Sequence, residues 1–306
     1  NRDILNTKQL YKMTKNQLGF LYFFMSCCAF SVMDALVKWL SHIPLGEVMF
    51  ARGVGGFIPL LFLVPRGRLK NFYYTKKPGT HLLRCLAGVV ALIAIFISLR
   101  VLPLATVTSL TYAAPMFTTI LSIFLLGERV RFVRWSACII GFLGVLLICF
   151  KGGNFDEINF YMFLPLVFCI GMSYVAILIK KLSKTEPVYL IAGYFSLTIA
   201  IVGLFIPDKD WVMPNFTDFV LLLSVGLSGG CANALLSAGL KRSDVSSVIS
   251  LKYTTLIFAI FFGWLIWDEI PTLITLSGAG LIIFSSLIIY QREAFYKKRV
   301  SIPRHE

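Results

Sequence analysis

The chain has 306 residues, of which 58% are hydrophobic and 14% are charged, and its mean hydropathy is +0.81. This composition is typical of a membrane protein and excludes a sizeable soluble domain, because soluble domains carry roughly 25% charged residues. The net charge of +14 would suggest nucleic-acid binding in a soluble protein, so the position of the basic residues decides its meaning.

Ten apolar segments are long enough to cross a bilayer, which takes roughly 20 residues per helix. The first follows a basic tail, residues 1–16, without a small-residue cleavage site, and is expected to stay in the protein as a signal anchor. The predicted fold is an all-α membrane protein with ten transmembrane helices, at about 17–40, 44–64, 81–100, 105–126, 133–150, 159–180, 187–206, 216–238, 246–267 and 271–290, before a second basic tail, 291–306.

The basic residues alternate between the two sides of this predicted bundle. The two tails and every second loop carry 23 of the 29 lysines and arginines, and the opposite side carries only Arg100, Lys151 and Lys209. The positive-inside rule therefore places both termini in the cytoplasm. Because topology accounts for the charge, no nucleic-acid partner is expected, and membrane lipids and a small-molecule substrate are the predicted partners of a monomer or homodimer.

The two halves of the chain resemble each other at nearly the same offset. Residues 35–41 match residues 177–183 at an offset of 142, and residues 105–128 match residues 246–269 at an offset of 141. The second match pairs Tyr112 with Tyr253 and Glu128 with Glu269. The halves 17–150 and 151–290 each hold five spans, and an odd number inverts the second copy. Inverted repeats predict alternating access around a site near the bilayer midplane.

Several motifs resemble the EamA-type members of the drug/metabolite transporter superfamily. They are Asp34-Ala-Leu-Val-Lys38, Glu47-Val-Met-Phe-Ala-Arg52, Pro115 inside a span, Leu125-Leu-Gly-Glu128 and Gly141-Phe-Leu-Gly-Val. The resemblance covers nearly the whole chain, and the order of the motifs is most similar to S-adenosylmethionine uptake carriers of intracellular bacteria. It implies an inner-membrane carrier of small organic metabolites with a central cavity lined by spans 1, 3, 4, 6, 8 and 9. The expected substrate is amphoteric, like S-adenosylmethionine or an amino acid, and an exporter of drugs, amines or amino acids is the alternative.

Charged residues inside spans are the first candidates for substrate binding, because an ionisable group in the bilayer is costly unless it is paired or hydrated. Asp34 either pairs with Lys38, four residues later on the same helical face, or binds a substrate amine or proton. Arg52 lies about 12 Å beyond Pro44 along its helix and is expected to meet a charge partner or a substrate anion. Lys252, two turns into span 9, either extends to the cytoplasmic face or binds a substrate carboxylate or phosphate.

Aromatic residues complete the predicted substrate site. Their rings can hold a cationic or planar ligand, although each can instead pack against neighbouring helices or lipid. The candidates are Tyr112, Tyr174, Tyr253 and Trp264. Pro115 should kink span 4 beside this site and serve as a hinge. Glu128 and Glu269 are expected to cap helices or form pairs at the interface, and the glycines of spans 2, 5, 8 and 10 to permit close helix packing.

The sequence offers little for an enzyme. It contains no Ser-His-Asp set, no metal-ligand cluster and no phosphate-binding loop, so no catalytic residue, metal or cofactor is predicted. A membrane-embedded enzyme is kept as the alternative from a different class, together with a channel or receptor-like scaffold.

Overall fold

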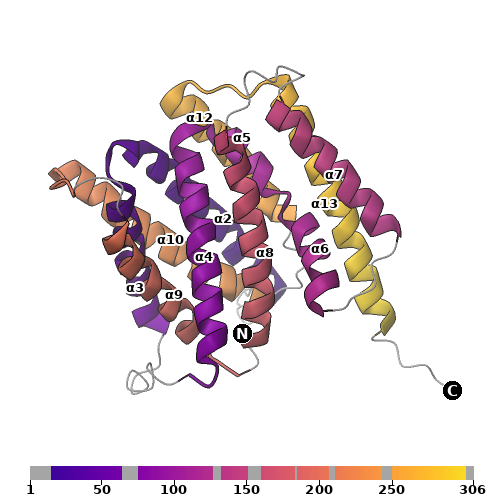
Figure 1. The fold of residues 1–306 in the computed structure, drawn as a ribbon, viewed down its shortest axis with the longest axis horizontal. Coiled ribbons are helices and arrows are strands. Elements are labelled where there is room, and N and C mark those ends of the chain that lie inside the picture. Colours follow the sequence, from indigo (N-terminus) through magenta and orange to yellow (C-terminus); the bar gives the residue numbers. More distant parts are fainter. Residues whose placement is uncertain are drawn as a thin grey trace, which may run out of the picture.

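The computed structural model describes residues 15–63, 75–126, 132–150, 160–182, 185–206, 211–242 and 250–300, and these are helical apart from short connections (Figure 1). The helices of the first half are α2 (Lys15–Trp39), η1 (Leu40–His42), α3 (Leu45–Leu63), α4 (Pro78–Val101), α5 (Leu104–Thr111), α6 (Ala114–Leu126) and α7 (Phe132–Phe150). Those of the second half are η4 (Phe160–Phe163), α8 (Leu164–Leu182), α9 (Val188–Phe205), α10 (Phe216–Arg242), η5 (Ser250–Tyr253), α12 (Thr254–Trp267) and α13 (Leu273–Val300).

Each predicted span corresponds to an observed helix or pair of helices. The fourth is divided, because two residues separate α5 from α6, whereas the sixth and the ninth begin with 3-10 turns, η4 and η5, that run directly into α8 and α12. Hydropathy alone locates the segments because the apolar runs are long and separated by charged loops. It does not reveal the division of the fourth span or the 3-10 turns, because these leave the mean hydropathy of a window unchanged.

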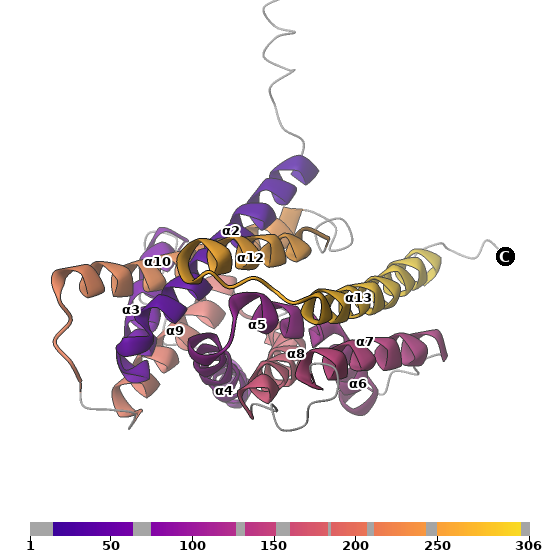
Figure 2. The same ribbon diagram turned by 90° about the horizontal axis from the view of Figure 1, so that it is seen from above.

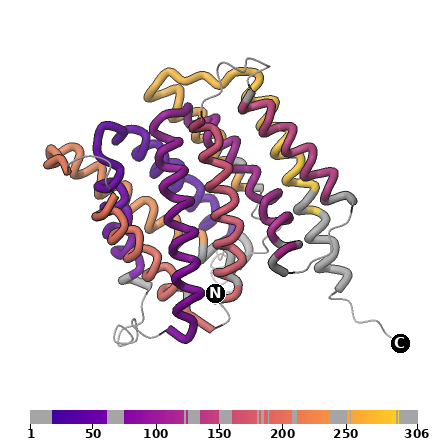
Figure 3. The backbone as a smooth tube through the Cα atoms, in the orientation of Figure 1, coloured from indigo at the N-terminus to yellow at the C-terminus, as the bar shows by residue number. Residues whose placement is uncertain are grey.

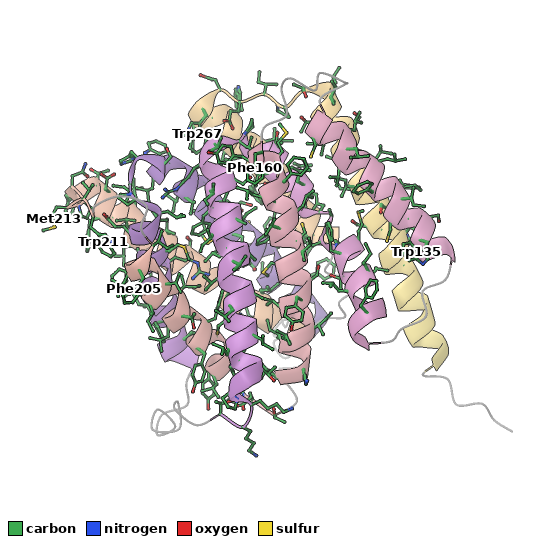
Figure 4. All side chains as sticks on the ribbon, viewed as in Figure 1. Trp135, Phe160, Phe205, Trp211, Met213 and Trp267 are labelled. Atoms are coloured by element: carbon green, nitrogen blue, oxygen red, sulfur yellow. The ribbon has the colours of Figure 1, made fainter. Side chains whose placement is uncertain are left out.

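Five helical segments are long and apolar enough to cross a membrane, namely Leu18–His42, Pro78–Val101, Leu104–Leu121, Phe160–Ile179 and Phe216–Leu236. Four shorter apolar helical segments accompany them at Trp135–Cys149, Tyr189–Phe205, Thr254–Trp267 and Leu273–Ile288. The outer surface is apolar as well, since large side chains such as Phe205, Trp211 and Met213 are exposed and point away from the bundle (Figure 4). Exposed apolar surface on this scale is typical of a protein solvated by lipid, and the chain is an integral membrane protein.

The helices form two outer groups on either side of a central group. In both Figure 1 and Figure 2, α7 and α13 lie side by side at one edge, and α3, α9 and α10 lie at the other. Between them, α4 packs against α8, and α2 packs against both α10 and α12. The tube in Figure 3 shows α5 ending inside the bundle, where the chain turns into α6.

Close approach between helices depends on glycine at several crossings, such as those of α3 with α10 and of α7 with α13. A Cβ atom added to Gly55 on α3 would lie 2.6 Å from the Cα atom of Gly226 on α10. One added to Gly144 on α7 would lie 2.7 Å from the carbonyl oxygen of Gly278 on α13. These pairs bear out the expectation that small residues allow the helices to pack closely.

Candidate substrate site

The division between α5 and α6 lies inside the bundle and follows from Pro115. Proline has no N–H, so the Thr111 carbonyl cannot accept the usual helical bond from the residue four positions later. The chain tightens here instead: the Tyr112 N–H bonds to the Ser109 carbonyl at 3.2 Å and the Ala113 N–H to the Leu110 carbonyl at 3.1 Å. Span 4 is therefore interrupted just before Pro115, as the sequence predicts, at about 12 Å along the helix axis from the start of α5.

Side chains from neighbouring helices bind the carbonyl groups around this break. The Cys169 thiol on α8 lies 3.5 Å from the Thr111 carbonyl oxygen and 3.6 Å from that of Leu110. The Ser286 hydroxyl on α13 donates to the Tyr112 carbonyl at 2.9 Å, and the Ser173 hydroxyl on α8 donates to the Ala114 carbonyl at 3.0 Å. A break at membrane depth is tolerated when protein groups satisfy the freed backbone in this way.

The start of the helix in the ninth span, formed by η5 and α12, meets the divided helix at the same place. The Tyr112 hydroxyl lies 2.7 Å from the Thr255 hydroxyl of α12 and donates to the Lys252 carbonyl of η5 at 3.3 Å. Tyr112 is fully buried, so its ring fixes the position of the break while its hydroxyl reaches the other half of the chain. The 3-10 turn η5 thus lies against the α5–α6 break, although Leu256 takes the place that Pro115 holds in the first copy.

Lys252 places a cation at this crossing. Its side chain lies near the thiols of Cys27 on α2 and Cys169 on α8, which places the ammonium between these two helices at the level of the break. Within the described part of the chain, no carboxylate lies within the 4.0 Å salt-bridge distance of this ammonium. An ammonium at this depth without a protein counterion is suited to binding an anionic group of a ligand.

Asp34 contributes a carboxylate on α2, seven residues or about 10 Å along the axis from Cys27. Its charge is attracted by Arg52 on α3, although the two groups are not within salt-bridge distance. Arg52 is only 3% exposed; its Nη2 donates to the Gly229 carbonyl at 3.1 Å, and its Nε has no acceptor among the described residues. The guanidinium is thus held against α10 and balances the Asp34 charge from one side.

Lys38 does not pair with Asp34, which is one of the two predicted alternatives for Asp34. Its ammonium pairs with Glu269, in the connection between α12 and α13, and donates to the Leu102 carbonyl at 2.9 Å. Glu269, 231 positions away in the sequence, takes the place of Asp34 as the partner of Lys38, because the end of α2 lies beside the end of α12. The expectation that Glu269 forms a pair is confirmed, while Glu128 lies outside the described residues.

The three other aromatic residues predicted for the substrate site differ in where the structure places them. Tyr174 is half-buried on α8 beside Ser173, and the side chain of Tyr253 lies outside the described part of the chain. The structure does not bring Trp264 to the crossing: it is 54% exposed on α12, on the same face as the exposed Ile257, Phe261 and Leu265. Cys27, Cys169 and Thr255 are not singled out by the sequence. For Thr255 the available signal was its place three residues after Lys252, as a polar residue at the start of an apolar run.

Comparisons with known proteins agree on one class of protein, the transporters. The profile of the EamA-like transporter family matches residues 17–150 and 159–291. The S-adenosylmethionine uptake transporter of Rickettsia bellii is 29% identical over 92% of this chain and 97% of its own. The pseudopaline exporter CntI of Pseudomonas aeruginosa is 26% identical over 89% and 95% of the two chains, and the riboflavin transporter of Vibrio cholerae is 24% identical over 92% and 95%.

A solved crystal structure shares the fold with a TM-score of 0.61, at 18% identity, and the alignment covers 93% of this chain and 99% of the other. The family and the relatives are described as transporters and not as enzymes. With a family profile that covers nearly all of both halves, the chain belongs to the EamA-like transporter family.

Proposed function

We propose that this protein is a secondary active transporter that moves an amphoteric metabolite, S-adenosylmethionine or a similar molecule, across the bacterial inner membrane by alternating access. The observation that carries the proposal is the Lys252 ammonium, which has no carboxylate partner among the described residues and lies where the 3-10 turn η5 meets the α5–α6 break. Divided helices near the midplane are where transporters of repeated architecture bind their substrates.

Helix packing supports an inverted repeat. If each half holds five spans, α2 corresponds to α8, α3 to α9, α4 to α10, the α5–α6 pair to η5–α12, and α7 to α13. The contact of α2 with α10 then has its counterpart in that of α8 with α4, and the contact of α12 with α2 in that of α6 with α8. The pairs α3–α9 and α7–α13 are each their own counterpart, as a two-fold relation requires.

The charges in the site favour a zwitterionic or cationic amino acid. Lys252 would bind the substrate carboxylate, and Asp34 would bind the positively charged end. S-adenosylmethionine carries a carboxylate, an ammonium and a sulfonium, and its adenine ring can stack on the half-buried Tyr174. The similarity to named S-adenosylmethionine uptake transporters agrees with this assignment.

Orientation and direction are inferred from the sequence. The positive-inside rule places both termini in the cytoplasm, which puts the α12–α13 connection on the outer side. Uptake is the proposed direction because of the S-adenosylmethionine relatives; export of an amine or amino acid is the second candidate, favoured by the similarity to the pseudopaline exporter.

The proposal is tested by ligand-dependent thermal stability of the purified protein in detergent. The panel is S-adenosylmethionine, S-adenosylhomocysteine, riboflavin, a polyamine and free amino acids. A ligand at 100 times its dissociation constant stabilises the folded state by about 2.7 kcal/mol, enough to detect. S-adenosylhomocysteine is the matched control, because it differs by the methyl group that gives the sulfur its charge.

We expect stabilisation by S-adenosylmethionine and a smaller effect of S-adenosylhomocysteine. A response confined to polyamines or free amino acids would overturn the uptake proposal in favour of the exporter. A response to riboflavin alone, which has no carboxylate, would refute the role of Lys252 and Asp34.

A further inference from the structure

Three separate segments meet at the end of the bundle where α12 joins α13, opposite the end at which α4 begins (Figure 1). The Glu269 carboxylate pairs with Lys38 at the end of α2 and accepts the Leu104 N–H, the first of α5, at 3.2 Å. Lys38 also binds the Leu102 carbonyl in the turn between α4 and α5. We call Lys38, Glu269 and the Leu102–Leu104 backbone the end latch.

Aromatic rings shield the end latch from solvent. The Lys38 ammonium lies 5.0 Å from the ring centroid of Trp267, and Trp39 packs edge-on against Trp267 at 6.2 Å. The Lys38 side chain is 8% exposed and that of Glu269 24%. An ion pair with two further hydrogen bonds at such low exposure is stronger than a surface pair, because little water screens it.

Backbone geometry at Asp268 directs Glu269 into the end latch. Asp268 has φ of +53°, the left-handed conformation that favours glycine, and it is the one such non-glycine residue in the described part of the chain. Its N–H bonds to the Trp264 carbonyl at 3.1 Å, and the Glu269 N–H reaches back to the Gly263 carbonyl at 3.0 Å. The chain therefore reverses at Asp268 and turns Glu269 toward α2 and α5.

We propose that the end latch is the outer gate of the transport cycle, with Lys38 and Glu269 as its closing pair and Asp268 as the residue that positions Glu269. The proposal rests on the proposed transport function. The three segments joined by the end latch continue into the helices that carry Asp34, Tyr112 and Lys252, so opening the outer end requires that Lys38 and Glu269 separate. Lys38 lies one turn beyond Asp34 on α2, between the substrate site and the outer surface.

The first and second halves of the sequence carry the same residue types at the positions of this ion pair. Lys180 and Glu128 stand at the positions equivalent to Lys38 and Glu269, and Gly127 stands at the position of Asp268. Glycine is the residue that adopts the left-handed conformation without strain. The side chains of the equivalent residues lie outside the described part of the chain, and the proposal depends only on the end latch itself.

The experiment measures access to the path between the end latch and the substrate site. Thr108 is buried on α5, midway between Leu104 and Tyr112, and a Thr108→Cys probe reports that path through its rate of reaction with a membrane-impermeant maleimide. The full chain is used in right-side-out vesicles, and the same variants with Thr108 intact give the contribution of the seven native cysteines. No substrate is needed, so the result is independent of the ligand panel.

Glu269→Gln and Lys38→Gln are expected to raise the labelling rate of the probe by tenfold or more. The charge exchange Lys38→Glu with Glu269→Lys should return it toward the original rate. Asp268→Val should raise the rate because a β-branched residue resists positive φ, whereas Asp268→Gly should leave it unchanged. Asp268 is exposed, so this matched pair tests the gate even if the charge variants do not fold.

An unchanged labelling rate in Asp268→Val and in the folded charge variants would overturn the proposal and make the end latch a static tie. Equal acceleration in Asp268→Gly and Asp268→Val would refute the positioning role of Asp268. If the gate proposal is wrong, stabilisation by S-adenosylmethionine is still expected. If the substrate assignment is wrong, the labelling pattern of the probe is still expected.

Discussion

The hydrogen bond between Tyr112 at the α5–α6 break and Thr255 on α12 can be tested by removing the two hydroxyls. Tyr112→Phe keeps the buried ring and loses the 2.7 Å contact with Thr255 and the 3.3 Å contact with the Lys252 carbonyl. Because Thr255 also donates to the Lys252 carbonyl at 2.7 Å, neither change leaves that carbonyl without a donor. A net cost of about 1 kcal/mol per lost hydrogen bond is expected, without the larger cost of an unsatisfied buried group.

The measurement is a double-mutant cycle with Tyr112→Phe and Thr255→Val, read as the thermal midpoint in detergent and as the dissociation constant for S-adenosylmethionine. The two changes should couple by about 0.5–1.5 kcal/mol in stability. Each single variant should weaken ligand binding several-fold, because the contact positions the backbone of Lys252. Thr198→Val is the matched control, since the Thr198 hydroxyl donates only within its own helix, to the Tyr194 carbonyl at 2.7 Å. Additive effects of the two changes, with no coupling, would refute the contact.

Two further substitutions test how the site is built. Gly229→Ala should destabilise the protein by about 1–3 kcal/mol, because the added methyl group would overlap the Arg52 guanidinium. Gly280→Ala is the control and should not destabilise it, because a methyl group there meets no atom within 4 Å. Thermal melting compares the two variants. Cys169→Ala should lower the free energy of unfolding by about 1 kcal/mol and weaken ligand binding, because the Thr111 carbonyl freed by Pro115 loses its donor. Cys169→Ser should keep the stability and the affinity of the wild-type protein. Equal melting temperatures and equal affinities of the serine and alanine variants would contradict this.

The sequence predicts the helices well because long apolar runs separated by charged loops have few alternative structures in a bilayer. It also predicts the division of span 4, since Pro115 removes a specific hydrogen bond. The 3-10 turn η5 has no such signal, because Leu256 replaces the proline, and only the sequence repeat relates this turn to the α5–α6 break. The alignment of residues 105–128 with residues 246–269 therefore indicates an irregular turn in the second segment, which that segment's own sequence does not.

Side-chain partners are harder to predict than helices. The i, i+4 rule selects Asp34 as the partner of Lys38, but tertiary packing brings Glu269 closer, and no local pattern encodes a contact over 231 positions. Trp264 illustrates the same difficulty: its place in a span next to Lys252 does not say which way it faces, and the rotation of α12 directs it outward. Depth in the membrane follows from sequence position, whereas the direction that a side chain faces follows from the packing of whole helices.

The central claim is tested most directly by uptake of labelled S-adenosylmethionine into proteoliposomes containing the wild-type protein, Lys252→Gln or Lys76→Gln. Lys76 is an exposed lysine before α4 and controls for loss of one positive charge. We predict uptake by the wild-type protein and by Lys76→Gln, and at least a tenfold loss in Lys252→Gln at equal amounts of folded protein. Equal uptake by all three would contradict the assignment of Lys252 to the substrate carboxylate and with it the proposed site.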